Sequence, residues 1–205
     1  MKEIGRLYVV SPEPDEGVVE KIIEAARCGA DIVQIRGKNV NKAKLTELIL
    51  YIKERIPENV VLIVNDFPDV AINAGADGIH GGQSDFGFED IKIFKEKYNL
   101  IVGISVYDSI KRAQLAEKYG ADYVAFSSPF PSPSKKKVIT PLEVIEKASG
   151  ILKIPVFVIG GINDENAQIL LKRGVYGIAS LSYVFSGNTC EKVRRLKNIL
   201  KCYVP

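Results

Sequence analysis

The chain has 205 residues, of which 46% are hydrophobic and 26% charged, which suits one soluble domain with a full core. Its net charge of +3 is mild and no dense basic stripe is present, so we do not expect a nucleic-acid partner. No apolar run reaches the roughly 18 residues that span a bilayer. Because the first residues do not resemble a signal peptide either, we expect a cytoplasmic protein with no membrane partner.

Eight short apolar stretches are predicted to be β-strands, and their continuous apolar character is typical of parallel strands buried on both faces. In chain order they are residues 7–10, 32–36, 60–64, 78–80, 100–104, 123–126, 155–159 and 177–180. Four of them follow a glycine motif directly, which is Gly-Ala-Asp at 29–31, 75–77 and 120–122 and Gly-Val-Tyr at 174–176. A glycine at this place can end a helix with a positive φ, so each motif predicts the end of a helix and the start of a strand.

Amphipathic segments between the strands predict helices, and Asn163 and Asp164 are candidate caps for one of them. The clearest segments are 18–27, 42–55, 109–119, 165–173 and about 190–201. Eight strands alternating with eight helices, at about 26 residues per unit, predict an α/β fold, a single (β/α)8 TIM barrel over residues 1–205. An open doubly wound sheet is the alternative, but the near-equal units and the absence of G-x-G-x-x-G after the first strand favour the closed barrel.

The three cysteines are Cys28, Cys190 and Cys202. They are too few for a disulfide framework, and their spacing does not match a zinc motif. Cys28 lies on an apolar helical face, so we expect it to pack in the core.

Polar residues where a strand ends are the candidates for function, because the active site of a TIM barrel lies at the carboxyl ends of its strands. The second strand leads into Gln34, Arg36 and Lys38. An arginine and a lysine together could hold a diphosphate, and Gln34 could form hydrogen bonds with a heterocycle. The alternative for the two cations is ordinary solvent-facing charge.

The third and fourth strands lead into two carboxylates. Asn65 and Asp66 follow the third strand, and Asp85 follows the fourth. Mg²⁺ commonly takes one or two protein carboxylates together with substrate phosphate oxygens, so the pair predicts a magnesium–diphosphate site. Each aspartate alone could instead be a helix cap or a turn residue. The single histidine, His80, is expected to have a structural role.

The remaining strand ends carry hydroxyls and glycines. Ser105 could donate to a phosphate or a ring nitrogen, and no nucleophile elbow or triad accompanies it. The segment 127–137 combines prolines, hydroxyls and Lys135, which could bind phosphate or form a solvated loop. Loops after the last two strands of such barrels often bind phosphate, which makes Gly161 and Ser182 candidates. Two anion sites predict the joining of two phosphorylated small molecules with pyrophosphate as the leaving group.

The strand ends also form short motifs in a fixed order. They are Gln34-Ile35-Arg36-Gly37-Lys38, Asn65-Asp66, the stretch His80-Gly81-Gly82-Gln83-Ser84-Asp85, Gly103-Ile104-Ser105, Ser132-Pro133-Ser134-Lys135, Gly160-Gly161-Ile162 and Leu181-Ser182. In order and spacing they resemble the thiamine phosphate synthase family over nearly the whole chain, with its Q-L-R-E-K, N-D, H-L-G-Q-x-D, G-V-S and T-x-T-K motifs.

The resemblance implies a reaction and roles for these residues. The family joins 4-amino-2-methyl-5-pyrimidinylmethyl diphosphate to a hydroxyethylthiazole phosphate and releases pyrophosphate. Asp66 and Asp85 would hold Mg²⁺. The residues implied to contact the pyrimidine diphosphate are Gln34, Arg36, Lys38, Asn65, Ser105 and Lys135, of which Arg36, Lys38, Ser105 and Lys135 would be catalytic. The residues implied to line the thiazole-phosphate site are Ser132, Ser134, Gly161, Leu181 and Ser182.

The chain departs from the family pattern at several places. Gly37 stands where the family has an acid, Gly81 or Gly82 where it has leucine, and 127–129 differ from its G-P-[IV]. Serines replace the two threonines of its T-x-T-K motif. One alternative is the related TenI-like thiazole tautomerase, which lacks the N-D pair and has a catalytic histidine where this chain has Ser128. The other is a non-catalytic barrel that binds phosphate ligands. A homo-oligomer is possible in each case.

Overall fold

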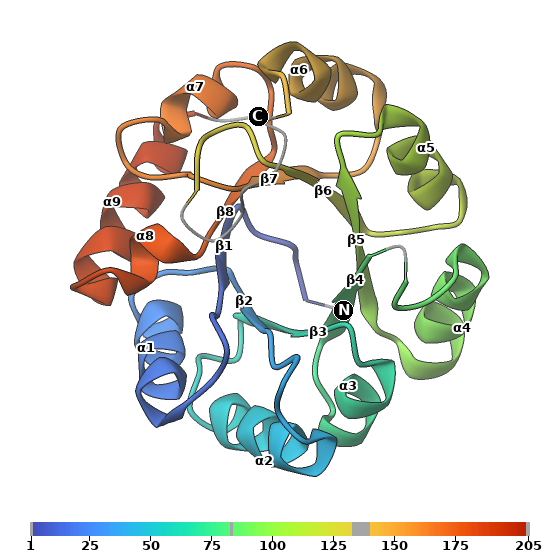
Figure 1. The fold of residues 1–205 in the computed structure, drawn as a ribbon, viewed down its shortest axis with the longest axis vertical. Helices are drawn as coiled ribbons and strands as arrows, with labels where there is room; N and C mark the ends of the chain where they lie inside the picture. The colour runs from blue at the N-terminus through green and yellow to red at the C-terminus, as the bar shows by residue number, and fades with distance from the viewer. Residues whose placement is uncertain (1, 83, 133–139, 204–205) are drawn as a thin grey trace.

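The computed structural model describes residues 2–82, 84–132 and 140–203. Eight parallel strands close into one barrel in the order β1 to β8, with helices around its outside (Figure 1). The barrel closes because β1 pairs with β8, with Tyr8 opposite Ala179. The predicted TIM barrel is therefore confirmed, and the open doubly wound sheet is wrong.

The strands lie where the apolar stretches predicted them. They are β1 Leu7–Val10, β2 Ile32–Ile35, β3 Val61–Asn65, β4 Gly78–Gly81, β5 Ile101–Tyr107, β6 Tyr123–Ser127, β7 Val156–Ile159 and β8 Gly177–Ser180. The largest difference is β5, which continues past residue 104 through a register shift between Ser105 and Tyr107. This irregularity lies at the carboxyl end of the barrel, where the candidate site residues are.

The described residues contain nine helices, one more than the eight expected. They are α1 Glu16–Arg27, α2 Lys42–Lys53, α3 Pro68–Ala74, α4 Phe88–Tyr98, α5 Ile110–Lys118, α6 Leu142–Ile151, α7 Ala167–Leu171, α8 Ser182–Phe185 and α9 Thr189–Lys201. The additional helix, α8, is too short to show an amphipathic period. Within the described ranges, we find no helix with the length and apolar character that crossing a membrane requires.

The helix α7 begins later than predicted. Asn163 does act as a cap, since its Oδ1 accepts hydrogen bonds from the backbone N–H groups of Glu165 and Asn166, both at 3.0 Å. It caps the turn before the helix, so α7 itself starts at Ala167. Asp164 is instead paired with Arg195, at 3.0 Å.

The glycines of the four repeated motifs have the positive φ that the sequence predicted. Their values are 117° at Gly29, 59° at Gly75, 90° at Gly120 and 76° at Gly174. The aspartates of the three Gly-Ala-Asp motifs have a further role that was not predicted. Each carboxylate accepts a hydrogen bond from a backbone N–H of an earlier strand and pairs with a lysine. The donor and lysine are Leu7 and Lys197 for Asp31, Leu62 and Lys2 for Asp77, and Val102 and Lys95 for Asp122.

Two groups of buried side chains form the core. The larger group lies between the strands and the helices. The smaller one comes from alternate positions of seven strands and therefore fills the inside of the barrel. The largest side chains inside are Tyr8, Tyr123 and Phe157, all at most 2% exposed. These rings form a packed floor beneath the carboxyl ends of the strands.

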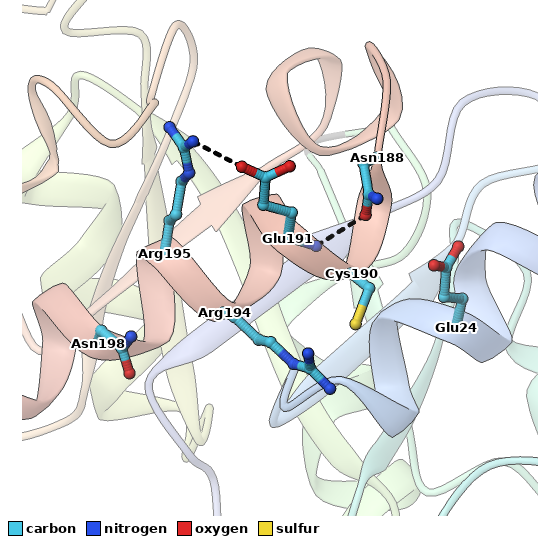
Figure 2. Close-up of a pocket in the computed structure, with 7 residues that line it drawn as sticks. All are labelled: Glu24, Asn188, Cys190, Glu191, Arg194, Arg195 and Asn198. Atoms are coloured by element: carbon cyan, nitrogen blue, oxygen red, sulfur yellow. Dashed lines mark hydrogen bonds and ion pairs between the residues drawn. The ribbon is translucent and has the colours of Figure 1, made fainter.

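We expected Cys28 to pack in the core and did not predict a disulfide; Cys28 does pack against the core, but it is also disulfide-bonded. Cys28, at the end of α1, is bonded to Cys190 in α9, with their Cα atoms 5.3 Å apart and 162 residues between them in sequence. Figure 2 shows Cys190 on α9 beside α1, which carries Glu24. The closed barrel brings the two helices together, because β1 and β8 are neighbours. Cys202 is free and exposed.

Candidate active site

A cavity of about 450 Å³ opens at the carboxyl ends of the strands. This volume is in the range of pockets that bind small molecules. Eight of the predicted site residues line it, which are Gln34, Arg36, Asn65, Ser105, Ser132, Gly161, Leu181 and Ser182. Residues from β1 to β8 thus converge on one cavity, as the TIM barrel predicts.

Three predicted residues lie beside this cavity instead of lining it. They are Lys38, Asp66 and Asp85, and the Lys38 Nζ lies 2.9 Å from Asp66 Oδ2. Lys38 is half-exposed on the loop after β2, so its contact with a ligand would require it to leave Asp66 or to share it. The predicted site residues Ser134 and Lys135 lie outside the described residues, as does Gln83 of the third motif.

Asp66 and Asp85 face each other, as predicted from neighbouring strand ends. Burial raises the pKa of Asp66, and the adjacent Asp85 raises it further against the opposing effect of Lys38. Burial acts in the same direction on Asp85, but the Gly82 N–H at 2.6 Å and a hydrogen bond with Asp66 lower the pKa of Asp85 overall. The pair therefore has one readily ionised carboxylate, Asp85, and one carboxyl, Asp66, whose ionisation is disfavoured.

This pair fits a magnesium ion that arrives with a diphosphate. Among the residues that the structure describes, no group of three or more His, Cys, Asp or Glu side chains is placed to hold a metal. Mg²⁺ usually keeps several waters and takes one or two carboxylates plus substrate phosphates, so two aspartates suffice. The repulsion between them is what a cation would relieve.

A chain of buried polar side chains lies under the cavity, and sequence reasoning missed two of its members, Tyr8 and Tyr123. Tyr8 donates to Gln34 Oε1, and its hydroxyl lies 2.8 Å from that of Tyr123. Tyr123 lies 3.1 Å from His80 Nδ1, and His80 Nε2 lies 2.9 Å from Ser105 Oγ. At the other end, Gln34 Nε2 donates to Asn65 Oδ1 at 2.5 Å. The sequence did contain a signal for them, because a tyrosine at a buried strand position needs a hydrogen-bond partner for its hydroxyl.

A structural role was expected of His80, and it links Tyr123 to Ser105 by hydrogen bonds while it also lines the cavity. Its ring also stacks on that of Tyr123, with the centroids 5.6 Å apart. The rings of Tyr8 and Phe157 support the pair from the inside of the barrel. The orientation of Ser105 is therefore determined by groups buried below it.

The opposite side of the cavity is formed by the ends of β6 to β8. Gly161 has φ 67°, and a Cβ at this position would lie 2.4 Å from the carbonyl oxygen of Pro131. Asn166 Nδ2 donates to the carbonyl of Gly161 at 2.8 Å, which holds this loop in place. Ser128 is buried, and its Oγ donates to the carbonyl of Phe130 at 2.9 Å. The backbone can approach a ligand closely here only because Gly161 has no side chain.

The structure accounts for two departures from the family motifs. A Cβ at Gly37 would lie 2.9 Å from Leu45 Cδ1 of α2, so an acidic side chain would have to displace a buried leucine. A Cβ at Gly81 would lie 2.2 Å from the ring of Phe86. Phe86 thus occupies the space that a leucine at residue 81 would need.

A second hollow, of about 360 Å³, lies on the outside of the barrel between α1 and α9 (Figure 2). Within it, Glu191 pairs with Arg195 at 2.6 Å and the Asn188 side chain accepts from the Glu191 N–H at 2.9 Å. None of the predicted site residues lines it. The barrel cavity is therefore the candidate active site.

Known proteins resemble the chain over almost its whole length. Residues 7–184 match the family described as "Thiamine monophosphate synthase". The thiamine-phosphate synthase of Pyrococcus furiosus is 38% identical over 189 residues, 91% of this chain and 90% of the relative. That of Persephonella marina is 35% identical over 95% of each chain.

Solved structures give the same result. The thiamine phosphate pyrophosphorylase from Pyrococcus furiosus superposes with a TM-score of 0.86 at 36% identity, over 98% of this chain and 97% of the other. A 3-hexulose-6-phosphate synthase, with a TM-score of 0.75 at 18% identity, shares the fold. With a family match over most of its length and relatives well above 30% identity, the chain belongs to the thiamine monophosphate synthase family.

Proposed function

We propose that the protein is a thiamine phosphate synthase, a transferase that joins 4-amino-2-methyl-5-pyrimidinylmethyl diphosphate to a hydroxyethylthiazole phosphate and releases pyrophosphate. One observation carries the proposal: a single cavity is lined on one side by Gln34, Arg36 and Ser105 and on the other by Gly161 and Ser182. The first side suits a pyrimidine and its diphosphate, and the second suits a thiazole phosphate. Relatives named thiamine-phosphate synthase support the reading.

The proposed diphosphate site consists of Arg36, Lys38 and the aspartate pair. The fixed fork of Arg36 binds phosphate oxygens, while Lys38 adds a mobile charge from the same loop. Mg²⁺, held by Asp66 and Asp85, would neutralise charge that develops on the leaving pyrophosphate. The sequence places Lys135 in the same role, outside the described residues.

The reaction needs no protein nucleophile. The bond between the methylene carbon and the diphosphate oxygen breaks, the bonding electrons leave with pyrophosphate, and the electron-rich pyrimidine supports the methylene cation. The thiazole nitrogen then forms the new carbon–nitrogen bond. The protein contributes by holding both reactants in the cavity and by stabilising the leaving group electrostatically, which are the large terms in such a displacement.

The proposed thiazole-phosphate site lies at the ends of β6 to β8. Ser132, Ser134 and Ser182 would supply hydroxyls, while Gly161 and Leu181 would let the backbone approach the phosphate. A phosphate anchored there tethers the thiazole, so that its nitrogen meets the methylene carbon. In the thiazole tautomerase alternative a histidine would be required at Ser128, whose hydroxyl here is bound to a backbone carbonyl.

The cytoplasmic location and a homo-oligomer are parts of the proposal that come from the sequence alone. The disulfide between Cys28 and Cys190 bears on the first of them, because stable disulfides inside cells are characteristic of hyperthermophiles. The proposal therefore favours a hyperthermophilic source if the protein is intracellular.

The test is pyrophosphate release by the purified protein, with each substrate and the metal omitted in turn. The proposal predicts release only when both substrates and Mg²⁺ are present. Release without the thiazole phosphate would indicate a hydrolase. If folded protein releases no pyrophosphate but isomerises a thiazole substrate, the protein is a tautomerase. If it shows neither activity, the non-catalytic phosphate-binding barrel is the remaining alternative.

A further inference from the structure

A continuous hydrogen-bonded chain crosses the barrel under the cavity. Its members, in order, are Asn65, Gln34, Tyr8, Tyr123, His80 and Ser105. The first five side chains are at most 7% exposed. Polar groups buried to this degree lose most of their hydration, so a lost partner is costly and each bond of the chain constrains the next.

Counting protons gives the chain a direction. Burial raises the pKa of Tyr8 and of Tyr123, so each hydroxyl stays neutral and has one proton to donate. Tyr8 donates its proton to Gln34 Oε1 and must therefore accept from Tyr123, 2.8 Å away. Since Tyr123 has then used its proton, it accepts from His80 at Nδ1, 3.1 Å away.

The same proton count determines which group donates in the hydrogen bond between His80 and Ser105. A neutral His80 with its proton on Nδ1 has a lone pair on Nε2, which accepts from the Ser105 hydroxyl at 2.9 Å. The opposite direction requires both amides, Gln34 and Asn65, to be rotated so that oxygen and nitrogen exchange places. A mixture of directions would leave two donors or two acceptors facing each other within the chain, which is costly for buried groups, so the chain changes direction only as a unit.

We propose that Tyr8 and Tyr123 are positioning residues that hold His80 in its Nδ1–H tautomer and so make Ser105 Oγ a hydrogen-bond acceptor toward the cavity. At the far end of the chain, the amide nitrogens of Gln34 and Asn65 are donors. The two ends thus fit a ring that carries an amino group near Ser105 and an unprotonated nitrogen near the amides. An aminopyrimidine has this arrangement of donor and acceptor groups, and the analogue with a carbonyl oxygen in place of the amine does not. The identity of the ligand rests on the proposed function.

The tautomer can be measured without any substrate, because the chain has a single histidine. Protein labelled with ¹⁵N-histidine and carrying no histidine tag gives one imidazole in a ¹H–¹⁵N correlation spectrum. At about pH 8, above the usual imidazole pKa, the protonated and unprotonated nitrogens have widely separated shifts. The proposal predicts that Nδ1 carries the proton. The Nε2–H tautomer in the unaltered protein would overturn it.

Two variants test the role of the tyrosines. Tyr123→Phe keeps the ring but removes the acceptor at Nδ1, so the proton should move to Nε2 and be donated to Ser105. Tyr176→Phe is the matched control, because its ring also packs on Phe157 while its hydroxyl bonds to the carbonyl of Ile4, outside the chain. It should leave the tautomer unchanged. If the Tyr123→Phe protein does not fold, Tyr8→Phe replaces it, since it frees Tyr123 to donate to Nδ1.

Kinetics provide a readout that a purely structural role would not move. The ratio of kcat/KM for the aminopyrimidine diphosphate to that for its oxo analogue should fall roughly tenfold in Tyr123→Phe, the effect of about one hydrogen bond, and not in Tyr176→Phe. An unchanged tautomer and an unchanged ratio in Tyr123→Phe would overturn the proposal. If no turnover occurs in any protein, the proposed function fails, while the histidine spectrum still decides the direction of the chain.

Discussion

The disulfide between Cys28 and Cys190 should be a major source of stability, and replacing both cysteines by serine removes it. The bond joins residues 162 apart, so nearly the whole barrel lies in the loop that it closes. Chain-entropy arithmetic for a loop of this length gives about 5 kcal/mol, and removal of native disulfides typically costs about 2–5 kcal/mol. With an unfolding entropy of about 2.1 cal/mol/K per residue, a 205-residue chain should lose about 5–12 °C in Tm.

Differential scanning calorimetry of the unaltered protein, with and without reductant, and of the double variant measures this loss. Thiol titration in denaturant should find one thiol before reduction, that of Cys202, and three after it. Cys202→Ser is the control, since its thiol is exposed and free, and it should keep the full response to reductant. Three free thiols without reductant would show that the disulfide is absent, and a Tm that neither reduction nor the double substitution lowers would show that it does not stabilise the fold.

Three further changes test the site and the barrel. Asp66→Asn should abolish Mg²⁺-dependent pyrophosphate release yet raise the Tm of the metal-free protein at about pH 7. Because the fold raises the pKa of Asp66, ionising this carboxyl lowers the stability of the native state at pH values above the pKa of Asp in the unfolded chain. The gain in Tm should therefore vanish toward about pH 4 in a fluorimetric melting series. In steady-state kinetics, Gly161→Ala should raise the KM for the thiazole phosphate at least about tenfold, because the added methyl group would crowd the carbonyl of Pro131. Gly120→Ala is the control, since Gly120 also has a positive φ but has open space around it. It should cost about 1 kcal/mol of stability and leave this KM unchanged. Asp122→Ala should lower the free energy of unfolding in urea by about 1–3 kcal/mol, because it removes the acceptor for the Val102 N–H and the partner of Lys95, and equal stability would contradict the assigned role.

The fold could be predicted because its signals are local. Each buried parallel strand is a short apolar run, and Gly29, Gly75, Gly120 and Gly174 mark the points where helices end. The Gly-Ala-Asp repeat predicted these boundaries but not the bonds of its aspartates to earlier strands. Those bonds depend on which strands become neighbours, which only the closed barrel determines.

The site could be predicted only in part, for the same reason. Strand ends identified Gln34, Arg36 and Ser105, because all strands of a parallel barrel end at one face. Tyr8 and Tyr123 were missed because each reads as an ordinary apolar strand residue until its hydroxyl is seen between two others. The disulfide was missed because no local spacing links cysteines on the first and the last long helix of the chain.

In the proposed reaction, one cavity joins a pyrimidine diphosphate to a thiazole phosphate. A ³¹P NMR time course with equal amounts of both substrates and Mg²⁺ tests it most directly, since the diphosphate, the pyrophosphate and the two phosphate monoesters can be followed together. The diphosphate and the thiazole phosphate signals should disappear at equal rates, while pyrophosphate and one new monoester appear in equal amounts. Pyrophosphate or phosphate appearing while the thiazole phosphate signal stays constant would contradict it.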